Sequence, residues 1–303
     1  MKKIYVLLFL VLANLFWAGN YVFGEYLVAE MSPLQMTFSR WLIAVIFLVP
    51  LAHWIERPNW RNVWKEWKTL FILALLGVIS YNFLLYEALQ YTTSLNAALV
   101  NSINPAVIVL FSVLFLKEKI SSKNGIGLVV SLLGVLLVLT KGQLHLIIHN
   151  AYNQGDLLML IAILVWTIYS IIGRKTKEIP PISATSISVI FALIIMLPMV
   201  VVSGSNFNFH LSQHAVMGIV YMGIFPSVGS FIFWNISLRQ IDASKAGVYL
   251  NLITVFTAIF SLLLGNSISF VQVIGGILVF IGVYLTSVKG NKEKVQKLSV
   301  IKT

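Results

Sequence analysis

The side chains most able to do chemistry in this sequence are polar groups placed inside long apolar segments. In the segment 4–23, Asn14, Trp17 and Asn20 recur at three-residue intervals, which puts them on one face of a helix. Polar groups are costly in apolar surroundings, so they tend to face a cavity or a polar partner. This face predicts either the wall of a binding pocket, with aromatic surface and amide donors and acceptors, or an ordinary contact in which amides bond neighbouring helices.

The later apolar segments hold further candidates of the same kind. Pro105 cannot donate a hydrogen bond to the carbonyl of Asn101, so a helix through these residues should kink and free an acceptor. The kink predicts either a substrate-binding position or a packing feature that a neighbouring hydroxyl satisfies. The remaining candidates for binding a small molecule are Tyr81, Asn82, Asn104, Trp166, Tyr169, Tyr249 and Asn251.

Arg40 is a cation inside an apolar segment, roughly 9 Å from its nearer end at 1.5 Å per residue. A buried guanidinium needs carboxylates or several carbonyl groups. Glu87 is the acidic residue that lies among apolar residues near the corresponding end of another segment. Three interpretations stay open: an Arg40–Glu87 salt bridge or helix-end cap, a gate or contact with a substrate carboxylate, and extension of the side chain to the surface.

Other kinds of chemistry find little support. No phosphate-binding glycine loop, haem motif or serine-elbow motif occurs, and the chain contains no cysteine. We therefore expect no enzyme activity, no cofactor and no ATP-driven step by this chain alone. A metal site is not expected either, because zinc-motif spacing is absent from the histidines of the predicted loops, His145, His149, His210 and His214.

Membrane-spanning helices must position these candidates. Hydrophobic residues make up 59% of the 303 positions and charged residues 10%, compared with about 25% in soluble domains. A water-soluble fold cannot bury so much apolar surface, whereas a lipid bilayer can. Divided at turn residues into lengths of roughly 20, the apolar runs predict an all-α membrane protein with ten spans. These are 4–23, 34–53, 69–88, 95–116, 124–140, 157–173, 181–202, 215–237, 246–264 and 270–288.

The charges predict an orientation for the ten spans. With the N-terminus inside, 19 of the 21 Lys and Arg residues fall on the inner side, as the positive-inside rule expects. Lys141 lies outside, and Arg40 lies within a span. This distribution explains the net charge of +11 without a nucleic-acid partner. We expect a multi-pass protein of the plasma (inner) membrane with both termini in the cytoplasm, and Glu118 in an interfacial anchor or a cytoplasmic gate.

The sequence also repeats itself at an offset of 148 or 149 residues. Each half would contain five spans, and because five is odd, the second half must insert upside down relative to the first. Such inverted repeats are typical of transporters, in which two halves exchange conformations around a central site. The matching pairs include Trp17 and Trp166, Pro33 and Pro181, Pro50 and Pro198, Gly127 and Gly275, and Gly134 and Gly282.

Several of these features resemble the EamA branch of the drug/metabolite transporter superfamily. A tryptophan lies in the first span of each half, Ser32-Pro33 precedes the second span with Arg40 seven residues beyond the proline, and a Lys-Glu-Lys-Ile sequence ends the fourth span. The resemblance covers about 5–288. It implies two five-helix repeats, 4–140 and 155–288, before a basic cytoplasmic tail, 289–303, and transport of small metabolites, often amino acids. The second half departs from the pattern, with Asn266 in place of Glu118 and no arginine matching Arg40.

Together these observations predict a secondary transporter of small neutral or zwitterionic metabolites, with amino acids as the expected class and export as the expected direction. Phosphorylated substrates would need several Arg or Lys side chains. Proton coupling through Glu87 and facilitated diffusion both stay open, as do the monomeric and homodimeric states. The alternatives are a proton antiporter of cationic drugs, a channel, and a membrane sensor or enzyme that transports nothing.

Overall fold

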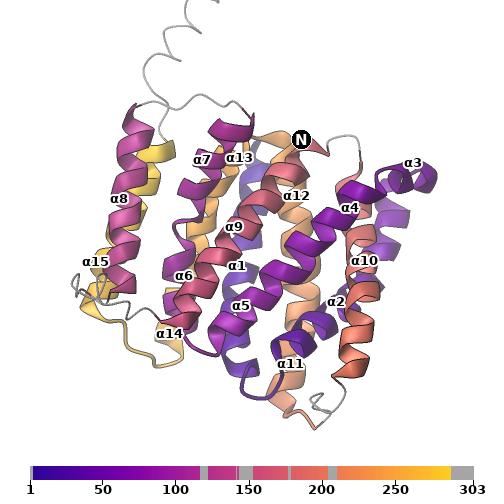
Figure 1. The fold of residues 1–303 in the computed structure, drawn as a ribbon, viewed down its shortest axis with the longest axis horizontal. Coiled ribbons are helices and arrows are strands. Elements are labelled where there is room, and N and C mark those ends of the chain that lie inside the picture. The colour runs from indigo at the N-terminus through magenta and orange to yellow at the C-terminus, as the bar shows by residue number, and fades with distance from the viewer. Residues whose placement is uncertain are drawn as a thin grey trace, which may run out of the picture.

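The computed structural model describes residues 3–116, 122–140, 142, 153–176, 179–203 and 210–287. These parts of the chain fold into helices without strands, and most of the helices run along one common direction (Figure 1). Eight helical stretches are long and apolar enough to cross a membrane, which makes this a multi-pass membrane protein. They are Ile4–Leu27, Pro33–Glu56, Trp67–Leu89, Ser94–Phe115, Gln154–Arg174, Pro181–Val202, Gln213–Gln240 and Lys245–Leu263.

The other two predicted spans, 124–140 and 270–288, fall on α8 (Ser122–Leu139) and α15 (Phe270–Ser287). The stretches that qualify as apolar helix there, Gly125–Val138 and Phe270–Gly282, are shorter than the eight candidate spans. The two helices lie against each other at one edge of the molecule (Figure 1). Many large apolar side chains on the outer surfaces of the bundle are exposed, as expected for helices that face lipid.

The first half of the chain contains helices of very different lengths. Ser32 caps the second of them, since its hydroxyl oxygen accepts a hydrogen bond from the backbone N–H of Gln35 at 3.2 Å, and Pro33 opens the helix. In chain order the helices are α1 (Lys3–Leu27), α2 (Pro33–Leu51), α3 (Trp60–Lys65), α4 (Trp67–Leu73), α5 (Tyr81–Leu89), α6 (Ser94–Asn101), α7 (Asn104–Leu116) and α8.

The second half follows the same plan in the part of the chain that the structure describes. Gly265, with a φ of +81°, ends the turn after the helix that contains Asn251, a left-handed conformation that glycine adopts without strain. The helices are α9 (Gln154–Lys175), α10 (Pro181–Val202), α11 (Gln213–Ile224), α12 (Phe231–Gln240), α13 (Ala243–Gly247), α14 (Asn251–Leu263) and α15.

Helical geometry is interrupted at comparable places in the two halves. A π-helical segment, Ala74–Ser80, joins α4 to α5, and another, Phe225–Ser230, joins α11 to α12. The next stretch breaks between Asn101 and Asn104 in the first half, which confirms the kink predicted before Pro105. In the second half a short 3₁₀ segment, Val248–Leu250, stands between α13 and α14. Such breaks leave backbone groups free for other partners.

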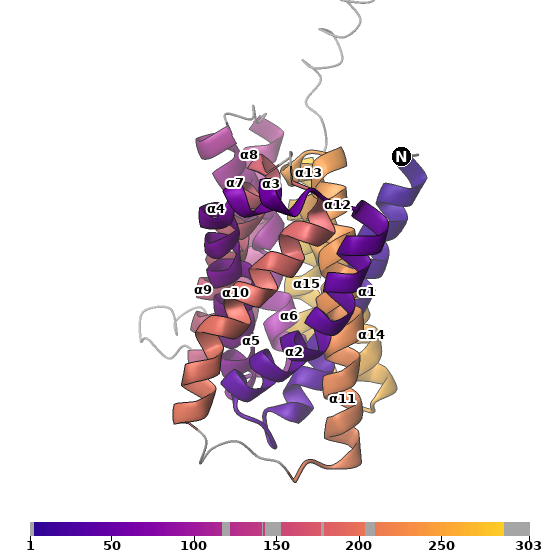
Figure 2. The same cartoon turned by 90° about the vertical axis from the view of Figure 1, so that its right-hand side faces the viewer.

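The first helices of the two halves run in opposite directions. Glu25, near the end of α1, accepts hydrogen bonds from the backbone N–H and the hydroxyl of Ser94, at 3.0 and 2.5 Å. Asp156, at the start of α9, accepts bonds from the side chains of Thr92 and Asn96 in the same region, at 3.2 and 2.6 Å. The end of α1 and the beginning of α9 therefore lie at the same end of the bundle, opposite the N-terminus (Figure 2).

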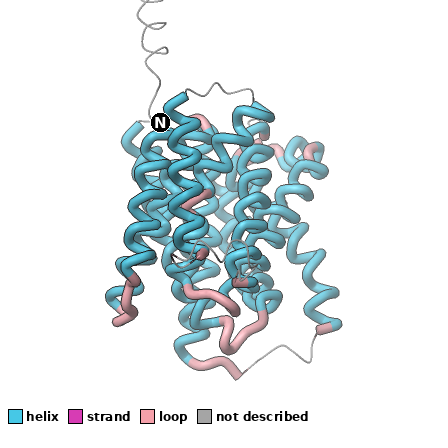
Figure 3. The backbone as a smooth tube through the Cα atoms, turned by 60° about the vertical axis from the view of Figure 1, so that its left-hand side comes forward, coloured by secondary structure: helices cyan, strands magenta, loops and turns pink. Residues whose placement is uncertain are grey.

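The segment 57–68 does not form one continuous helix. Within it α3 covers Trp60–Lys65, and Trp67 and Lys68 already belong to the next spanning stretch. Figure 3 shows that helices make up most of the described chain and that short loops connect them. Glu118, Lys141, His145, His149 and the tail 289–303 lie outside the described residues.

Candidate functional site

A cluster of aromatic side chains fills the centre of the bundle, where α1, α9 and α12 meet. The ring centroids of Trp17 and Trp166 lie 5.2 Å apart at an interplanar angle of 86°, an edge-to-face contact. Trp234 lies 5.7 Å from Trp17, and Phe231 lies 5.6 Å from Trp166. All four side chains are at least 94% buried. Trp17 and Trp166, which match in the sequence repeat, therefore pack directly against each other.

Two tyrosines extend this aromatic cluster. Tyr81 packs on Trp166 with a centroid distance of 4.8 Å, and Tyr169 packs on the same indole at 4.9 Å. The indole N–H groups of Trp166 and Trp234 are buried and have no hydrogen-bond partner. A buried donor without a partner costs about 1–3 kcal/mol. A hydrogen bond from either N–H group to a ligand atom, or to a side chain that moves next to it, would therefore be favourable in free energy.

Arg40 lies in a second polar cluster beside the aromatic one, and its side chain is completely buried. Its Nε donates to the hydroxyl of Ser227 at 2.7 Å, and its Nη1 donates to Asn20 Oδ1 at 2.9 Å and to Asn82 Oδ1 at 2.8 Å. Nη1 also bonds the hydroxyl of Tyr86, which in turn donates to Asn20 Oδ1 at 2.8 Å. Nη2 has no hydrogen-bond partner.

Two of the interpretations offered for Arg40 are wrong. The side chain does not reach the surface, since it is fully buried. It does not pair with Glu87 either, because all its hydrogen bonds go to neutral oxygens, while the Glu87 carboxylate accepts a bond from Gln90 Nε2 at 3.4 Å. Amide and hydroxyl oxygens from three different parts of the chain take the place of the expected carboxylate. Contact with a substrate or a gating role is the interpretation that stays open.

Asn82 owes its position to the π-helical segment before it. Its Nδ2 donates to the carbonyl oxygens of Gly77 at 3.0 Å and Val78 at 2.9 Å. The carbonyl of Val78 also accepts the indole N–H of Trp41, at 3.1 Å. The Ser227 hydroxyl donates to the carbonyl of Met222 at 2.6 Å next to the corresponding segment of the other half. Two of the four Arg40 acceptors, Asn82 and Ser227, are thus held in or beside a π-helical segment.

The candidates around the helix break form a third group. Asn104 Nδ2 donates to Asn101 Oδ1 at 3.2 Å, and Asn104 Oδ1 accepts from Thr167 at 3.4 Å, which joins α7 to α9. The structure leaves three amide atoms of these candidates buried and without a partner, namely Asn14 Oδ1, Asn101 Nδ2 and Asn251 Oδ1. Tyr249 is half-buried and packs at the edge of the core, and no hydrogen bond places it in any of the three groups.

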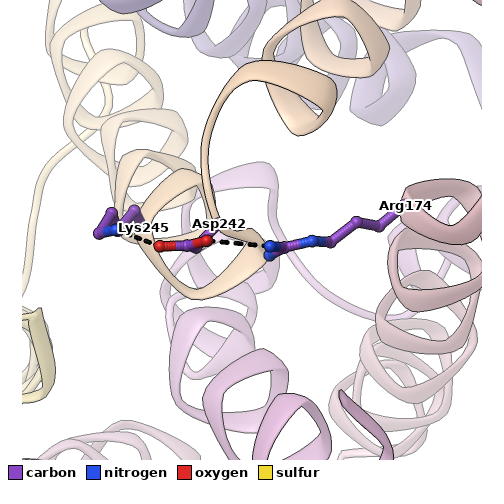
Figure 4. A network of polar contacts seen from close by, with 3 residues as sticks. All are labelled: Arg174, Asp242 and Lys245. Atoms are coloured by element: carbon purple, nitrogen blue, oxygen red, sulfur yellow. Dashed lines mark hydrogen bonds and ion pairs between the residues drawn. The ribbon is translucent and has the colours of Figure 1, made fainter. Parts of the chain in front are cut away.

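The end of the bundle that carries the N-terminus contains a groove next to Tyr169 of the aromatic cluster. Asn235 Nδ2 donates to the Tyr169 hydroxyl at 3.0 Å and to the Thr185 hydroxyl at 3.2 Å, so α9, α10 and α12 meet there. The groove is also lined by Gly173 and Arg239. Three residues beyond Arg239, Asp242 bonds Arg174 at 2.9 Å and also pairs with Lys245, as Figure 4 shows.

Sequence reasoning missed several residues of these groups. Trp234 and Phe231 lie three residues apart in the eighth predicted span, a spacing that could have placed both on one helix face. Ser227 and Tyr86 carry no signal of this kind, since they are recognised only by their contacts with Arg40. Glu25 also lies inside a described span, so Glu87 is not alone among the acidic residues of the apolar helices.

Comparison with known proteins agrees with this architecture. The chain is 27% identical over 289 residues to the uncharacterized transporter YyaM of Bacillus subtilis, which covers 95% of each chain. It is 29% identical over 284 residues to an uncharacterized transporter of Archaeoglobus fulgidus, covering 93% of this chain and 97% of the other. The WAT1-related protein At3g30340 of Arabidopsis thaliana is 25% identical over 306 residues, covering 91% and 84%.

A solved crystal structure shares the fold. It superimposes with a TM-score of 0.69 at 20% identity, and the match covers 94% of this chain and 98% of the other. The family comparison is more specific, because the EamA-like transporter family matches residues 4–140 and 153–288, nearly the whole chain. With its apolar helices and transporter relatives, this chain is a membrane transporter that belongs to the EamA-like transporter family.

Proposed function

We propose that this transporter carries small neutral or zwitterionic metabolites of the amino-acid class across the membrane without ATP. The observation that supports this most directly is the aromatic cluster of Trp17, Trp166 and Trp234, with its buried indole N–H groups and the neutral amides nearby. Rings and amides suit a small molecule with an apolar part and few charges. The guanidinium of Arg40 nearby disfavours a cation, which argues against export of cationic drugs.

We propose that transport proceeds by alternating access between two inverted repeats. Four features support this: α1 and α9 are antiparallel, both halves carry a π-helical segment in the third stretch, both are interrupted in the fourth, and the aromatic cluster takes residues from both halves. In this structure the centre is closed by aromatic packing, and a groove lined by Tyr169 opens at the end of the bundle that carries the N-terminus, which is the inner end in the proposed orientation. Export would begin when a metabolite enters from that groove.

The orientation belongs to the same proposal. The cation distribution supports cytoplasmic ends in the plasma membrane, with the loop near Ala29 outside and the loop near Asn62 inside. The chain has no cysteine, so Ala29→Cys and Asn62→Cys can each be labelled without background. A membrane-impermeant thiol reagent added to intact cells should label only the first. If the reagent labels Asn62→Cys and not Ala29→Cys, the protein has the opposite orientation and the proposal is wrong.

The transport proposal is tested with purified protein in liposomes. Labelled amino acids should exchange saturably in counterflow, and Trp17→Ala should lower the rate at least about tenfold, because it removes a ring in contact with three other aromatic residues. Trp54→Ala is the matched control, since that tryptophan is 71% exposed. Rates are compared per amount of folded protein recovered, because removal of a buried ring also lowers stability. If no neutral or zwitterionic metabolite exchanges saturably with the wild type, the proposal is wrong.

A further inference from the structure

The positive charge of Arg40 is not neutralised within its cluster. Its described partners are two amide oxygens and two hydroxyls, and none of them carries a charge. Transfer of an isolated charged group out of water is strongly unfavourable, and neutral dipoles offset only part of that cost. The guanidinium group of an arginine is a cation in proteins. Arg40 is therefore a buried cation without a counter-ion among the described residues, and binding of an anion beside it would be strongly favourable in free energy.

The free donors of Arg40 have the geometry that carboxylates prefer. Nη2 is buried and has no partner, while Nε, on the same edge of the guanidinium, bonds only the hydroxyl of Ser227, at 2.7 Å. This edge presents two parallel N–H groups, which match the two oxygens of a carboxylate. Ser227 is replaceable there, because its hydroxyl keeps the bond that it donates to the carbonyl of Met222 at 2.6 Å.

The Arg40 cluster is continuous with the aromatic cluster. Trp41, whose ring lies 5.2 Å from the guanidinium carbon, packs on Phe231 at a centroid distance of 4.8 Å. On another side, the Tyr81 ring packs on Trp166 at 4.8 Å, and its hydroxyl lies 3.2 Å from that of Tyr21. A ligand with its charged end at Arg40 would thus have its apolar part within reach of these rings.

We propose that Arg40 binds the carboxylate of the substrate through its Nε–Nη2 edge, so that a carboxylate is required for recognition. This inference rests on the proposed function and narrows it. Amino acids satisfy the requirement, whereas amines and neutral amides of the same size do not. The absence of an arginine matching Arg40 in the second half means that the site occurs once in the transport pathway.

The first test uses the wild-type protein and therefore does not depend on the folding of a variant. Phenylalanine, its amide and phenylethylamine form one matched series, and leucine, its amide and isoamylamine form another. Within each series the acid should inhibit counterflow of a labelled amino acid at least about tenfold more strongly than the amide or the amine, the size expected for loss of a charge-assisted hydrogen bond. Equal inhibition by acid and amide would overturn the carboxylate site and leave the proposed transport intact.

The second test separates binding from a structural role of Arg40. In Arg40→Gln the preference for acid over amide should fall to about one, whereas Arg40→Lys should keep part of it, because the charge remains and the planar fork is lost. Arg61→Gln, on the exposed surface of α3, is the control and should keep the wild-type preference. A purely structural arginine would change the amount of folded protein and the rate, but the preference of the surviving transporter would stay at its wild-type value.

Discussion

At the scale of single residues, several charged side chains of this protein form hydrogen bonds with neutral groups instead of pairing with an opposite charge. Arg40 bonds neutral oxygens, and three glutamates bond helix N-termini: Glu25 takes the N–H of Ser94, Glu30 that of Ser212, and Glu56 those of Ile182 and Ser183. The first turn of a helix offers unpaired N–H groups and the positive end of its dipole, so a carboxylate is stabilised there without a cation. These contacts connect helices that are distant in sequence.

Glu56 makes the clearest of these contacts and gives a stability prediction. Its carboxylate accepts the N–H groups of Ile182 at 2.8 Å and Ser183 at 2.7 Å, at the start of a helix whose own cap position, Pro180, has no side-chain acceptor. Glu56→Ala should destabilise the protein by about 0.5–2 kcal/mol, the usual worth of a helix cap. The measurement is thermal unfolding in detergent.

The control for that prediction is Glu66→Ala. Glu66 is exposed, and its bond to the Thr69 hydroxyl, at 3.5 Å, is long. Its removal should leave the melting temperature within the error of the wild type. If both variants lose the same stability, the Glu56 contact is not the cause. Glu56→Gln should lie between them, because one acceptor oxygen remains but the charge that favours the helix N-terminus is lost.

At the scale of elements, each end of the bundle has a polar contact, here called a tie, that joins two helices. The two ties lie at equivalent places of the sequence repeat. At one end Glu25 of α1 holds the start of α6 through Ser94. At the other end Arg174 of α9 holds the start of α13 through Asp242, at 2.9 Å (Figure 4). Arg174 follows Glu25 by 149 residues, so one position of the repeat carries opposite charges at the two ends. If transport proceeds by the proposed alternating access, each end can open only when these contacts break.

The inner tie can be tested with a reporter cysteine. Gly173 lines the inner groove, and a Cβ there would have no atom within 4 Å, so Gly173→Cys should fold normally. Asp242→Asn in this background removes the charge that pairs with Arg174 and Lys245, and the thiol should then react several-fold faster with a water-soluble maleimide. Arg61→Gln in the same background should leave the rate unchanged. An unchanged rate in Asp242→Asn would show that the pair does not restrain the inner end.

The same tie has a defined pH dependence. The hydrogen bond from Lys245, followed by that from Arg174, lowers the pKa of the Asp242 carboxyl below its usual value. A carboxylate with a lowered pKa stabilises the fold above its unfolded pKa, about 3.9, and loses this effect only as the pH falls through the lower folded value. The rate of Gly173→Cys labelling, corrected for thiol ionisation, should therefore be constant between pH 5 and 8. A change within this range would require another titrating group.

At the scale of the whole molecule, the sequence predicted what depends on hydropathy and missed what depends on contacts. The long helices, the kink at Pro105 and the meeting of Trp17 with Trp166 follow from local patterns and from the repeat. The partners of Arg40 could not be predicted, because Ser227 is 187 residues away and has no feature that marks it. The π-helical segments that position these partners also have no pattern of their own.

The repeat makes one last prediction, at the edge formed by α8 and α15. A Cβ on Gly134 would lie 2.7 Å from the carbonyl oxygen of Gly275, and a Cβ on Gly282 would lie 2.6 Å from that of Gly127. Gly134 and Gly282 are equivalent positions of the repeat, and so are Gly127 and Gly275, since each pair is 148 residues apart. The same close contact between a glycine and a carbonyl is therefore made twice, once from each half.

Gly282→Ala should force the helices apart and destabilise the protein by about 1–3 kcal/mol, as overpacking usually does. Gly125→Ala, on α8 with no atom within 4 Å of the new methyl group, is the matched control, and alanine favours a helix more than glycine does. Thermal unfolding of both variants in detergent measures the difference. If Gly282→Ala is as stable as Gly125→Ala, the close crossing of α8 and α15 does not limit stability, and other contacts between the halves, such as those of α1 with α14 and of α2 with α10, hold them together.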